Sequence, residues 1–333
     1  MDLVTGATGI VGTHVLLELL RAGRPVRALH RADSDRGIVQ RVFRHYGHEG
    51  LAGRIEWAQG DLQDVDALRD ALQGITHVYH AAAVVSFDPR HARSMYAVNA
   101  GGTANLVDMA LEAGVCRLCH VSSTAAIGSA GAGAVRDESM PWADVAGTSD
   151  YSRSKHLAEM EVQRGIAEGL DAVIVNPSVI IGPGAPGRSS MALLTRLRKG
   201  TRFYTRGTNA FVDARDVAAC MVALIERGSC GERYLIPGEN ATYRSLFEAA
   251  CRAFGNPAPT WEAKAWMLHL AWRAERLRSL LTGSSPLVTR TAVASALARR
   301  SYSGAKAAEL LGYRFRALEE SVANAASFAA AAS

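Results

Sequence analysis

The chain has 333 residues, of which 48% are hydrophobic and 21% are charged. This length and composition exclude a short peptide, a fibrous protein and a disordered tail, and they allow one large domain or two smaller ones. Its 37 Lys and Arg residues outnumber its 32 Asp and Glu residues, and they are spread along the chain. Such a spread argues against nucleic acid, which calls for a clustered basic face, and favours a small anionic ligand.

The N-terminal residues contain neither the basic segment nor the apolar segment of a signal peptide, so we expect a cytoplasmic protein. The most apolar later stretch, 263–281, is interrupted by charged residues and predicts an amphipathic helix, not a membrane span. We therefore predict no membrane partner. The five cysteines are odd in number and irregularly spaced, which fits a reduced compartment.

Residues 116–120 read Cys-Arg-Leu-Cys-His, the attachment pattern of c-type haem. The segment continues into Val121 and two serines as an apolar run, which is more typical of a buried strand that leads to a site. We favour the strand over haem. His45 and His48 form an H-x-x-H pair with no third ligand at suitable spacing, so we predict no metal.

Short apolar runs alternate with helical patterns, which is typical of βαβ units and a parallel sheet. The expected strands are 3–5, 26–30, 55–58, 77–80, 118–122 and 172–175, and the expected helices are 11–22, 65–72, 92–113 and 151–168. We predict an α/β fold: a doubly wound parallel sheet (Rossmann fold) with a smaller, mainly helical C-terminal substrate lobe. The expected nucleotide-binding domain is 1–176 plus about 208–237, and the expected lobe is about 177–207 plus 238–333.

A glycine-rich turn joins the first expected strand to the first expected helix and has the form T-G-x-x-G-x-x-G. In a dinucleotide site, Gly6 permits the tight turn, Gly9 lets a pyrophosphate approach the backbone, and Gly12 allows close helix–sheet contact. An ordinary glycine-rich turn is the alternative, and no phosphoryl-transfer P-loop is present. The residues expected to bind the cofactor here are Thr5, Gly6, Thr8, Gly9, Ile10, Val11 and Gly12.

The end of the second expected strand bears on the choice between NAD and NADP. An NAD site places Asp or Glu there to bind the ribose hydroxyls, but this chain has Arg31. A guanidinium can pair with a 2′-phosphate, so Arg31 favours NADP(H). Asp33 and Asp35 lie close enough to weaken the distinction, and Arg31 could also be a plain surface charge.

Tyr151 and Lys155 are four residues apart at the start of an expected helix, so they share one helix face. A neighbouring cation favours the phenolate, so Tyr151 could exchange a proton with a carbonyl or alcohol oxygen near neutral pH. Ser123, at the end of strand 118–122, could donate a hydrogen bond to the same oxygen. A Y-x-x-x-K pattern alone is common on exposed helices, but joined to the glycine turn it indicates an oxidoreductase site.

With these motifs the chain resembles the extended short-chain dehydrogenase/reductase family, of the NAD-dependent epimerase/dehydratase type, along nearly its whole length. Five further segments carry the resemblance: Gly60–Leu62, His80–Ala83, Asn99 with Gly102 and Thr103, Asn176–Ser178 with Gly182 and Pro183, and Phe211–Ala218. The resemblance implies a catalytic trio of Ser123, Tyr151 and Lys155. It also implies further cofactor contacts at Asp61, Leu62, Ala81, Ala82, Ala83, Asn99, Val121, Ser122, Tyr151, Lys155, Pro177, Ser178 and Val179.

Within the family, Val85-Ser86-Phe87 and the segment 211–217 are most similar to the dihydroflavonol reductase-like and 3β-hydroxysteroid dehydrogenase-like branch. That branch implies an NADPH-dependent reduction of a ketone or aldehyde, or the reverse oxidation, on an apolar or aromatic small molecule, and a possible homodimer. The expected pocket wall consists of Val85, Phe87, Thr124, Met140 and Met191, with Trp142, Trp266 and Met267 as further candidates.

Two other functions stay open. A nucleotide-sugar epimerase or dehydratase with tightly held NAD would use the same trio. Such enzymes often carry an arginine just before the segment 211–217, and this chain has Asn209 and Ala210 there. The third function is a non-catalytic NADP-sensing protein, which would usually lack the Tyr or the Lys, and both are present.

Overall fold

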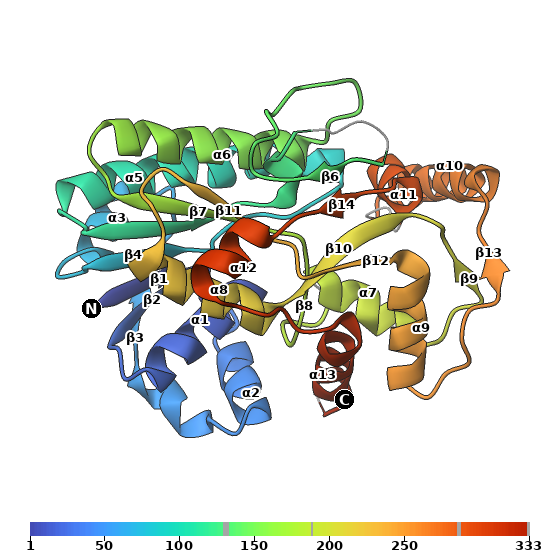
Figure 1. Ribbon diagram of the computed structural model, residues 1–333, viewed down its shortest axis with the longest axis horizontal. Helices are drawn as coiled ribbons and strands as arrows, with labels where there is room; N and C mark the ends of the chain where they lie inside the picture. The colour runs from blue at the N-terminus through green and yellow to red at the C-terminus, as the bar shows by residue number, and fades with distance from the viewer. Residues whose placement is uncertain (129–132, 188, 285–287, 332–333) are drawn as a thin grey trace.

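The computed structural model describes residues 1–128, 133–187, 189–284 and 288–331, and seven parallel strands form its central sheet (Figure 1). Their order across the sheet is β11 (Arg233–Ile236), β7 (Ala172–Pro177), β5 (Arg117–Val121), β4 (His77–His80), β1 (Asp2–Thr5), β2 (Val26–His30) and β3 (Ile55–Gln59). The predicted doubly wound α/β fold is therefore confirmed.

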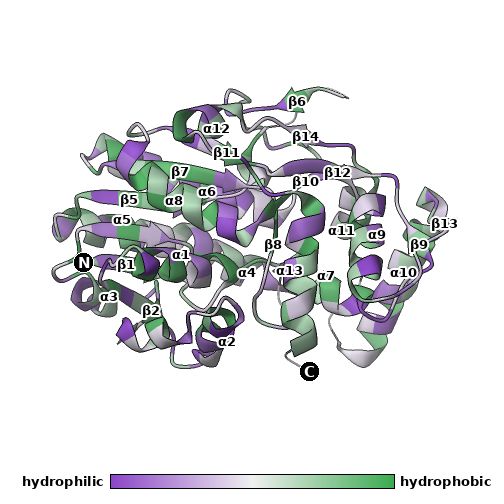
Figure 2. Ribbon diagram, turned by 60° about the horizontal axis from the view of Figure 1, so that its bottom comes forward, coloured by the Kyte–Doolittle hydropathy of each residue, from purple (hydrophilic) through white to green (hydrophobic). Residues whose placement is uncertain are grey.

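Helices cover both faces of this sheet, because side chains alternate between the two sides along each strand. Cys119 of β5 joins the core formed with α1 (Ile10–Arg21), α2 (Gly37–His45) and α8 (Ala214–Arg227). Its neighbour Leu118 joins the core on the opposite face, with α3 (Val65–Ala71), α5 (Gly102–Glu112) and α6 (Asp150–Ala167). Figure 2 shows β7 as a mainly hydrophobic strand between these layers, which is typical of a parallel sheet buried on both faces.

The helix expected over 92–113 is interrupted. It consists of α4 (Ala92–Met95), the π-helical segment η3 (Tyr96–Gly101) and α5. Within η3, the Asn99 carbonyl accepts a hydrogen bond from the Thr103 side chain at 2.5 Å, and the Asn99 side chain binds another loop. The expected helix therefore spans nearly its predicted range but contains a wider π-helical turn, of the kind found at functional sites.

A second sheet, which was not predicted, joins two strands of the expected lobe to a strand from segment 208–237 of the expected nucleotide-binding domain. Its strands are β12 (Glu239–Thr242), β10 (Thr208–Asp213) and β8 (Val179–Ile181). The surrounding helices are α7 (Ser189–Leu197), α9 (Tyr243–Ala253), α10 (Ala265–Thr282), α11 (Arg290–Leu297) and α13 (Leu318–Ala331), while α12 (Ala305–Leu311) packs against α8 of the core domain. The short strands β9 (Phe203–Tyr204) and β13 (Trp261–Glu262) pair at the far end of the lobe.

The sheet order places the candidate site. β2 and β3 lie on one side of β1, and β4, β5, β7 and β11 lie on the other side. The strand order therefore reverses between β1 and β4. Ligands of doubly wound sheets bind at this point, outside the carboxyl ends of the strands. Among the described residues, no helix has the length and apolar character needed to cross a membrane.

Candidate functional site

Close backbone packing at the turn between β1 and α1 leaves no space for a side chain at two of its glycines. Gly6 has φ +65°, and a Cβ there would lie 2.6 Å from the amide nitrogen of Ala82. A Cβ on Gly12 would overlap the Gly6 carbonyl oxygen. The first turn of α1, which follows Gly9, has no side-chain cap. Its amide groups are therefore available to a pyrophosphate, so the turn fits a dinucleotide.

A buried hydrogen-bond chain fixes the ends of β1 and β4 beside each other. Thr5 Oγ1 lies 2.7 Å from His80 Nδ1, and His80 Nε2 lies 2.9 Å from Thr103 Oγ1 on α5. Thr5 Oγ1 also accepts a hydrogen bond from the Ala82 amide at 3.3 Å. Burial lowers the pKa of His80 to about 3, so it is a neutral link. This chain of hydrogen bonds holds residues 81–83 next to the glycine turn.

Asn99 joins the loop after β4 to helix α6. Its Oδ1 accepts from the Val84 amide at 2.7 Å, and its Nδ2 donates to the Val84 carbonyl at 2.9 Å. The same Nδ2 donates to Ser154 Oγ at 3.0 Å. Ser154 lies between Tyr151 and Lys155, so Asn99 ties the loop that carries Val85 to the helix of the predicted catalytic residues.

The structure brings Ser123, Tyr151 and Lys155 together. Ser123 lies two residues after the end of β5, and its side chain caps the short helix η4 (Thr124–Ala126). Tyr151 is in the first turn of α6, whose N-cap is Ser149. The buried Lys155 Nζ donates to the Val121 carbonyl at 2.6 Å, which anchors α6 to the end of β5.

The pKa shifts differ from the expectation for an isolated Tyr–Lys pair. Burial raises the pKa of Tyr151 above its usual value, and the Ser123 side chain opposes this shift. Burial lowers the pKa of Lys155 to about 8, with Glu159 acting in the opposite direction. Burial is therefore the main influence on the pKa of Tyr151, and Lys155 is not. Tyr151 is a protonated hydroxyl at neutral pH.

Glu159 and Asn176 form hydrogen bonds that hold the end of β5 near Ser123, and the sequence analysis predicted neither of these roles. Asn176 Nδ2 donates to Glu159 Oε1 at 2.5 Å and to the Ser123 carbonyl at 3.1 Å. Arg233 lies 3.5 Å from the same carboxylate. The sequence did carry a signal for Glu159, because it lies one helical turn after Lys155 on the same face.

His120 also lies beneath the site. It is buried with its ring centroid 5.0 Å from that of His80, and burial lowers its pKa well below the usual value. Neither of its ring nitrogens has a hydrogen-bond partner within the described part of the chain. Unpaired buried nitrogens of this kind normally bind ordered water.

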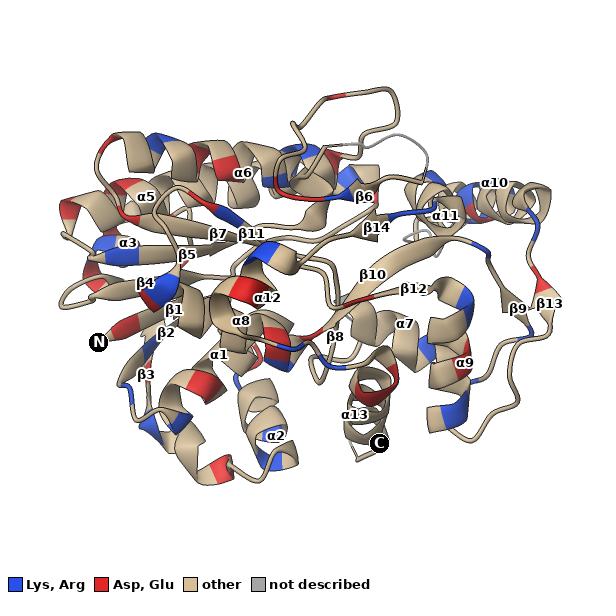
Figure 3. Cartoon of the chain, in the orientation of Figure 1, with Lys and Arg blue, Asp and Glu red and all other residues tan. Residues whose placement is uncertain are grey.

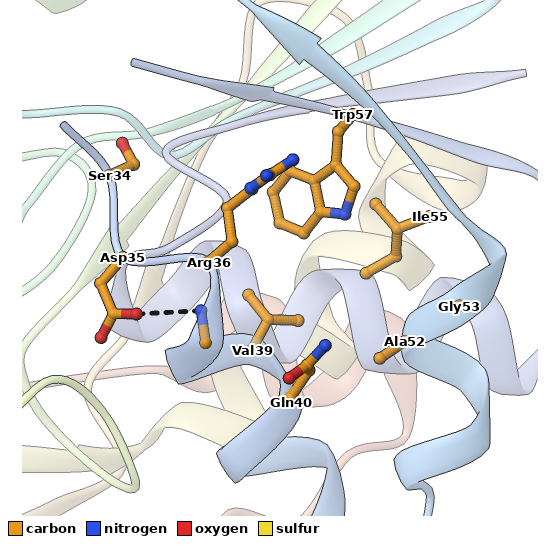
Figure 4. Close-up of a pocket in the computed structure, with 10 residues that line it drawn as sticks. Ser34, Asp35, Arg36, Val39, Gln40, Ala52, Gly53, Ile55 and Trp57 are labelled. Atoms are coloured by element: carbon orange, nitrogen blue, oxygen red, sulfur yellow. Dashed lines mark hydrogen bonds between the residues drawn. The ribbon is translucent and has the colours of Figure 1, made fainter. Parts of the chain in front are cut away.

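Arg31 lies at the end of β2, where its exposed side chain pairs with Asp33 at 3.2 Å. A cavity of about 570 Å³ adjoins this loop between α2 and β3 (Figure 4). In it, the Arg36 guanidinium lies over the Trp57 ring, with its carbon 5.6 Å from the ring centroid. Arg36 is not among the predicted cofactor residues, although its place in the same loop was a signal. The cavity is remote in sequence from the trio, none of which lines it.

The remaining predicted cofactor residues are spread along the same strand ends. Leu62 is held by α5, because the Asn105 side chain donates to its carbonyl at 2.9 Å, and Asp61 accepts from the Gln63 amide. Ser178 Oγ donates to the Pro237 carbonyl at 2.7 Å. Val121 ends β5 and Ser122 follows it, while Pro177 ends β7 and Val179 begins β8.

The five predicted pocket residues occupy different environments. Val85 and Phe87 are exposed, and the Phe87 ring lies edge-on to Tyr151 with 6.0 Å between centroids. Thr124 is buried directly after Ser123. Met140 packs against a small core cluster, and Met191 is buried in the main core. The structure thus places Phe87 and Thr124 at the trio, while Met140 is partly buried against a separate cluster and Met191 packs in the main core.

The cysteines and histidines outside this site show no ligand arrangement. Cys119 is buried on β5, as expected for a strand, and Cys116 is exposed just before this strand. His45 binds Asn324 at 2.9 Å. In residues 1–128, 133–187, 189–284 and 288–331, no group of three His, Cys, Asp or Glu could hold a metal ion.

Comparison with known proteins finds relatives along the whole chain. Residues 3–236 match the model of the NAD dependent epimerase/dehydratase family. The chain is 34% identical to a putative dihydroflavonol 4-reductase of Synechocystis over 97% of this chain and 92% of the relative. It is 36% identical to sterol demethylase protein B of Methylococcus capsulatus over 77% of this chain and 75% of the relative. The crystal structure of gox2253, at 32% identity, matches with a TM-score of 0.82 over 100% of this chain and 98% of that one.

Proposed function

Since this chain belongs to the extended short-chain dehydrogenase/reductase family, of the NAD-dependent epimerase/dehydratase type, we propose that it reduces a ketone or aldehyde with NADPH or catalyses the reverse oxidation. It is an NAD(P)-dependent oxidoreductase acting on CH–OH or C=O groups. The observation that carries the proposal is the meeting of Ser123, Tyr151 and Lys155 at the end of β5, beside the strand-order reversal.

The acid–base chemistry follows from the state of Tyr151. Reduction of a carbonyl needs a proton donor, and a tyrosine whose pKa is raised by burial keeps its proton at neutral pH. In the proposed mechanism Tyr151 gives this proton to the carbonyl oxygen, and Ser123 donates a hydrogen bond to the same oxygen. Lys155, fixed by the Val121 carbonyl, helps to hold the cofactor ribose.

NADPH, when bound, supplies the hydride, and the glycine turn with Asp61, residues 81–83 and Lys155 would hold it. Two arginines support the preference for NADPH over NADH, because Arg31 and Arg36 both lie in the loop after β2. The aspartates of this loop are neutralised: Asp33 pairs with Arg31, and Asp35 pairs with Arg41 at 2.7 Å. Residues 31–36 carry two arginines and two aspartates, so with Arg41 paired to Asp35 one positive charge is left for a 2′-phosphate.

The substrate we propose is an apolar or aromatic carbonyl compound. Phe87 supports this class, because its exposed ring lies next to Tyr151, and Val85 adds exposed apolar surface two residues away in the same loop. We also propose a homodimer, which is supported by the exposed Leu157 and Met160 on α6.

The test is a titration of the purified protein with NADPH and with NADH, after mass analysis of any nucleotide released on denaturation. We expect an empty site that binds NADPH reversibly and more tightly than NADH, followed by turnover on a panel of carbonyl compounds. Copurified NAD that does not exchange would instead favour the epimerase or dehydratase reaction. Binding of NADPH without turnover on any carbonyl or alcohol would favour the sensing protein.

A further inference from the structure

Helix α10 is an 18-residue helix whose outer side is covered by exposed apolar side chains. None of its residues is buried, and its main helical contact is with α11. Five large side chains are each 59% to 78% exposed: Trp266, Leu270, Leu277, Leu280 and Leu281. A contiguous apolar surface of this kind on a water-soluble domain normally marks an interaction site.

The exposed residues form a stripe. At 3.6 residues per turn, Trp266, Leu270, Leu277 and Leu281 fall within about 60° of one another around the helix axis. We call these four residues the α10 stripe. Leu270, Leu277 and Leu281 follow Trp266 by four, eleven and fifteen residues. The stripe is therefore an apolar ridge that reaches both ends of the helix.

Positive charges border the stripe on one side. Arg273 and Arg276 project from the same outer side of α10, and in the described part of the chain neither has an ion-pair partner. Lys264 precedes the helix and is also exposed. The acidic residue of the helix, Glu275, lies on the inner side, where it pairs with Arg278. The outer side of α10 is thus apolar and cationic, without a carboxylate.

The neighbouring strand pair extends this surface. Figure 1 shows β9 and β13 at the same end of the lobe as α10, and Figure 3 shows basic residues on the segments that flank β13, whose Glu262 pairs with Arg206. Trp261 is exposed and its ring lies edge-on to Phe203, with 6.2 Å between centroids. Arg202, next to Phe203, is exposed as well.

We propose that the α10 stripe docks on the surface of an anionic phospholipid bilayer. An interfacial helix needs leucines that reach the acyl boundary, tryptophan at the headgroup level, and arginine or lysine beside anionic headgroups. The outer side of α10 supplies all three. A second copy of the chain is a poorer occupant, since a symmetric contact would bring Arg273 and Arg276 of both copies together. This revises the expectation of no membrane partner and does not depend on the reaction proposed above.

The stripe also adjoins the candidate site. The carbonyl groups of Gly283 and Ser284, directly after α10, accept hydrogen bonds from Arg90 at 3.2 and 3.4 Å. Arg90 also pairs with Asp88, the residue after Phe87. Docking through α10 would therefore place the loop beside Tyr151 next to the lipid, from which an apolar compound could enter.

The experiment is cosedimentation of the full chain with vesicles of phosphatidylcholine alone or mixed with phosphatidylglycerol. We expect binding to the mixed vesicles and much weaker binding to phosphatidylcholine. Leu270→Glu with Leu277→Glu should reduce binding at least about tenfold. Arg273→Gln with Arg276→Gln should reduce it about 30-fold, at about 1 kcal/mol per arginine.

The matched control is Val135→Glu with Val145→Glu, which adds the same two charges at exposed apolar positions outside α10 and should bind as the parent does. Circular dichroism and NADPH binding show that each variant is folded. Failure of the parent to bind mixed vesicles would overturn the proposal, as would equal binding by the leucine variant. A parent dimer that the leucine variant converts to monomer, with no change in vesicle binding, would assign the stripe to a second copy instead.

Discussion

The side-chain amide of Asn176 donates a hydrogen bond to the buried carboxylate of Glu159, with 2.5 Å between the two atoms. Burial raises the pKa of Glu159, while Asn176 and Arg233 act in the opposite direction. A buried carboxylate is tolerated only where donors surround it. Since the same amide also binds the Ser123 carbonyl, the carboxylate and the end of β5 share one support.

Asn176→Asp should therefore destabilise the protein more than Asn176→Ala at pH 7, by about 3 kcal/mol, because two carboxylates would face each other in the interior. Urea unfolding at pH 7 and pH 5 measures this difference. It should shrink at pH 5, where one carboxyl group of the pair holds a proton. Equal stabilities of the two variants at pH 7 would show that the carboxylate of Glu159 does not depend on this contact.

Gly6→Ala should abolish dinucleotide binding. The new Cβ would lie 2.6 Å from the Ala82 amide, in addition to the strain of φ +65°. Gly23→Ala is the matched control, because Gly23 has φ +75° but a Cβ there would have none of the described residues within 4 Å. Fluorescence titration with NADPH measures the affinity of both. Nearly normal affinity in Gly6→Ala would mean that the turn does not carry the pyrophosphate.

Tyr151→Phe should lower kcat about 10²-fold or more, since it removes the proton donor. Its NADPH affinity should stay within about threefold of the parent, because the hydroxyl acts on the substrate oxygen. Steady-state kinetics on the best carbonyl substrate and a binding titration measure the two quantities. Tyr204→Phe, far from α6 in sequence, should change neither. Full turnover by Tyr151→Phe would exclude the assigned proton donor.

Lys155 gives the stability a specific pH dependence. Its pKa is about 8 in the folded protein and near 10.5 when unfolded, so between these values the unfolded chain binds more protons. Stability contributed by this group therefore rises with pH from 8 to 10.5, by about 3 kcal/mol, and is constant below pH 8. Urea unfolding of the parent and of Lys155→Met, compared across this range, isolates the effect. A constant difference between the two proteins would show that the ammonium is not desolvated.

Arg31→Glu should weaken NADPH binding by about 1–3 kcal/mol and affect NADH far less, because only NADPH carries the 2′-phosphate. Arg36→Glu tests the second arginine of the loop in the same way. Arg44→Glu, an exposed position on α2, serves as the charge-matched control. Titrations with both nucleotides give the ratio of affinities. An unchanged ratio in both loop variants would remove these arginines from the cofactor site.

Much of the core domain could be predicted because its signals are local. Strand runs, the glycine turn and the Tyr–Lys spacing each occupy a few consecutive residues, and alternation of strands and helices determines a parallel sheet. The trio was predicted from such signals, and the structure brings Ser123, Tyr151 and Lys155 together.

Other features depend on residues far apart in the chain. The π-helical turn at Asn99 exists because Val84 and Ser154 bind its side chain, and no helical periodicity reports those contacts. Likewise, Asn176 and Glu159 meet only after α6 packs on β7. The apolar side of α10 is exposed because no other element packs on it, and the sequence of the helix alone does not predict this.

The late position of β11 has a consequence for synthesis of the protein. Six strands of the central sheet lie within residues 2–177, but β11, which covers the free edge of β7, is formed by residues 233–236. During synthesis on the ribosome, the mainly apolar strand β7 therefore has an unpaired backbone edge until residues 178–236 have been translated. This interval is when the nascent chain is most prone to aggregate. A truncation before residue 233 would damage the nucleotide-binding domain itself, and not only the lobe.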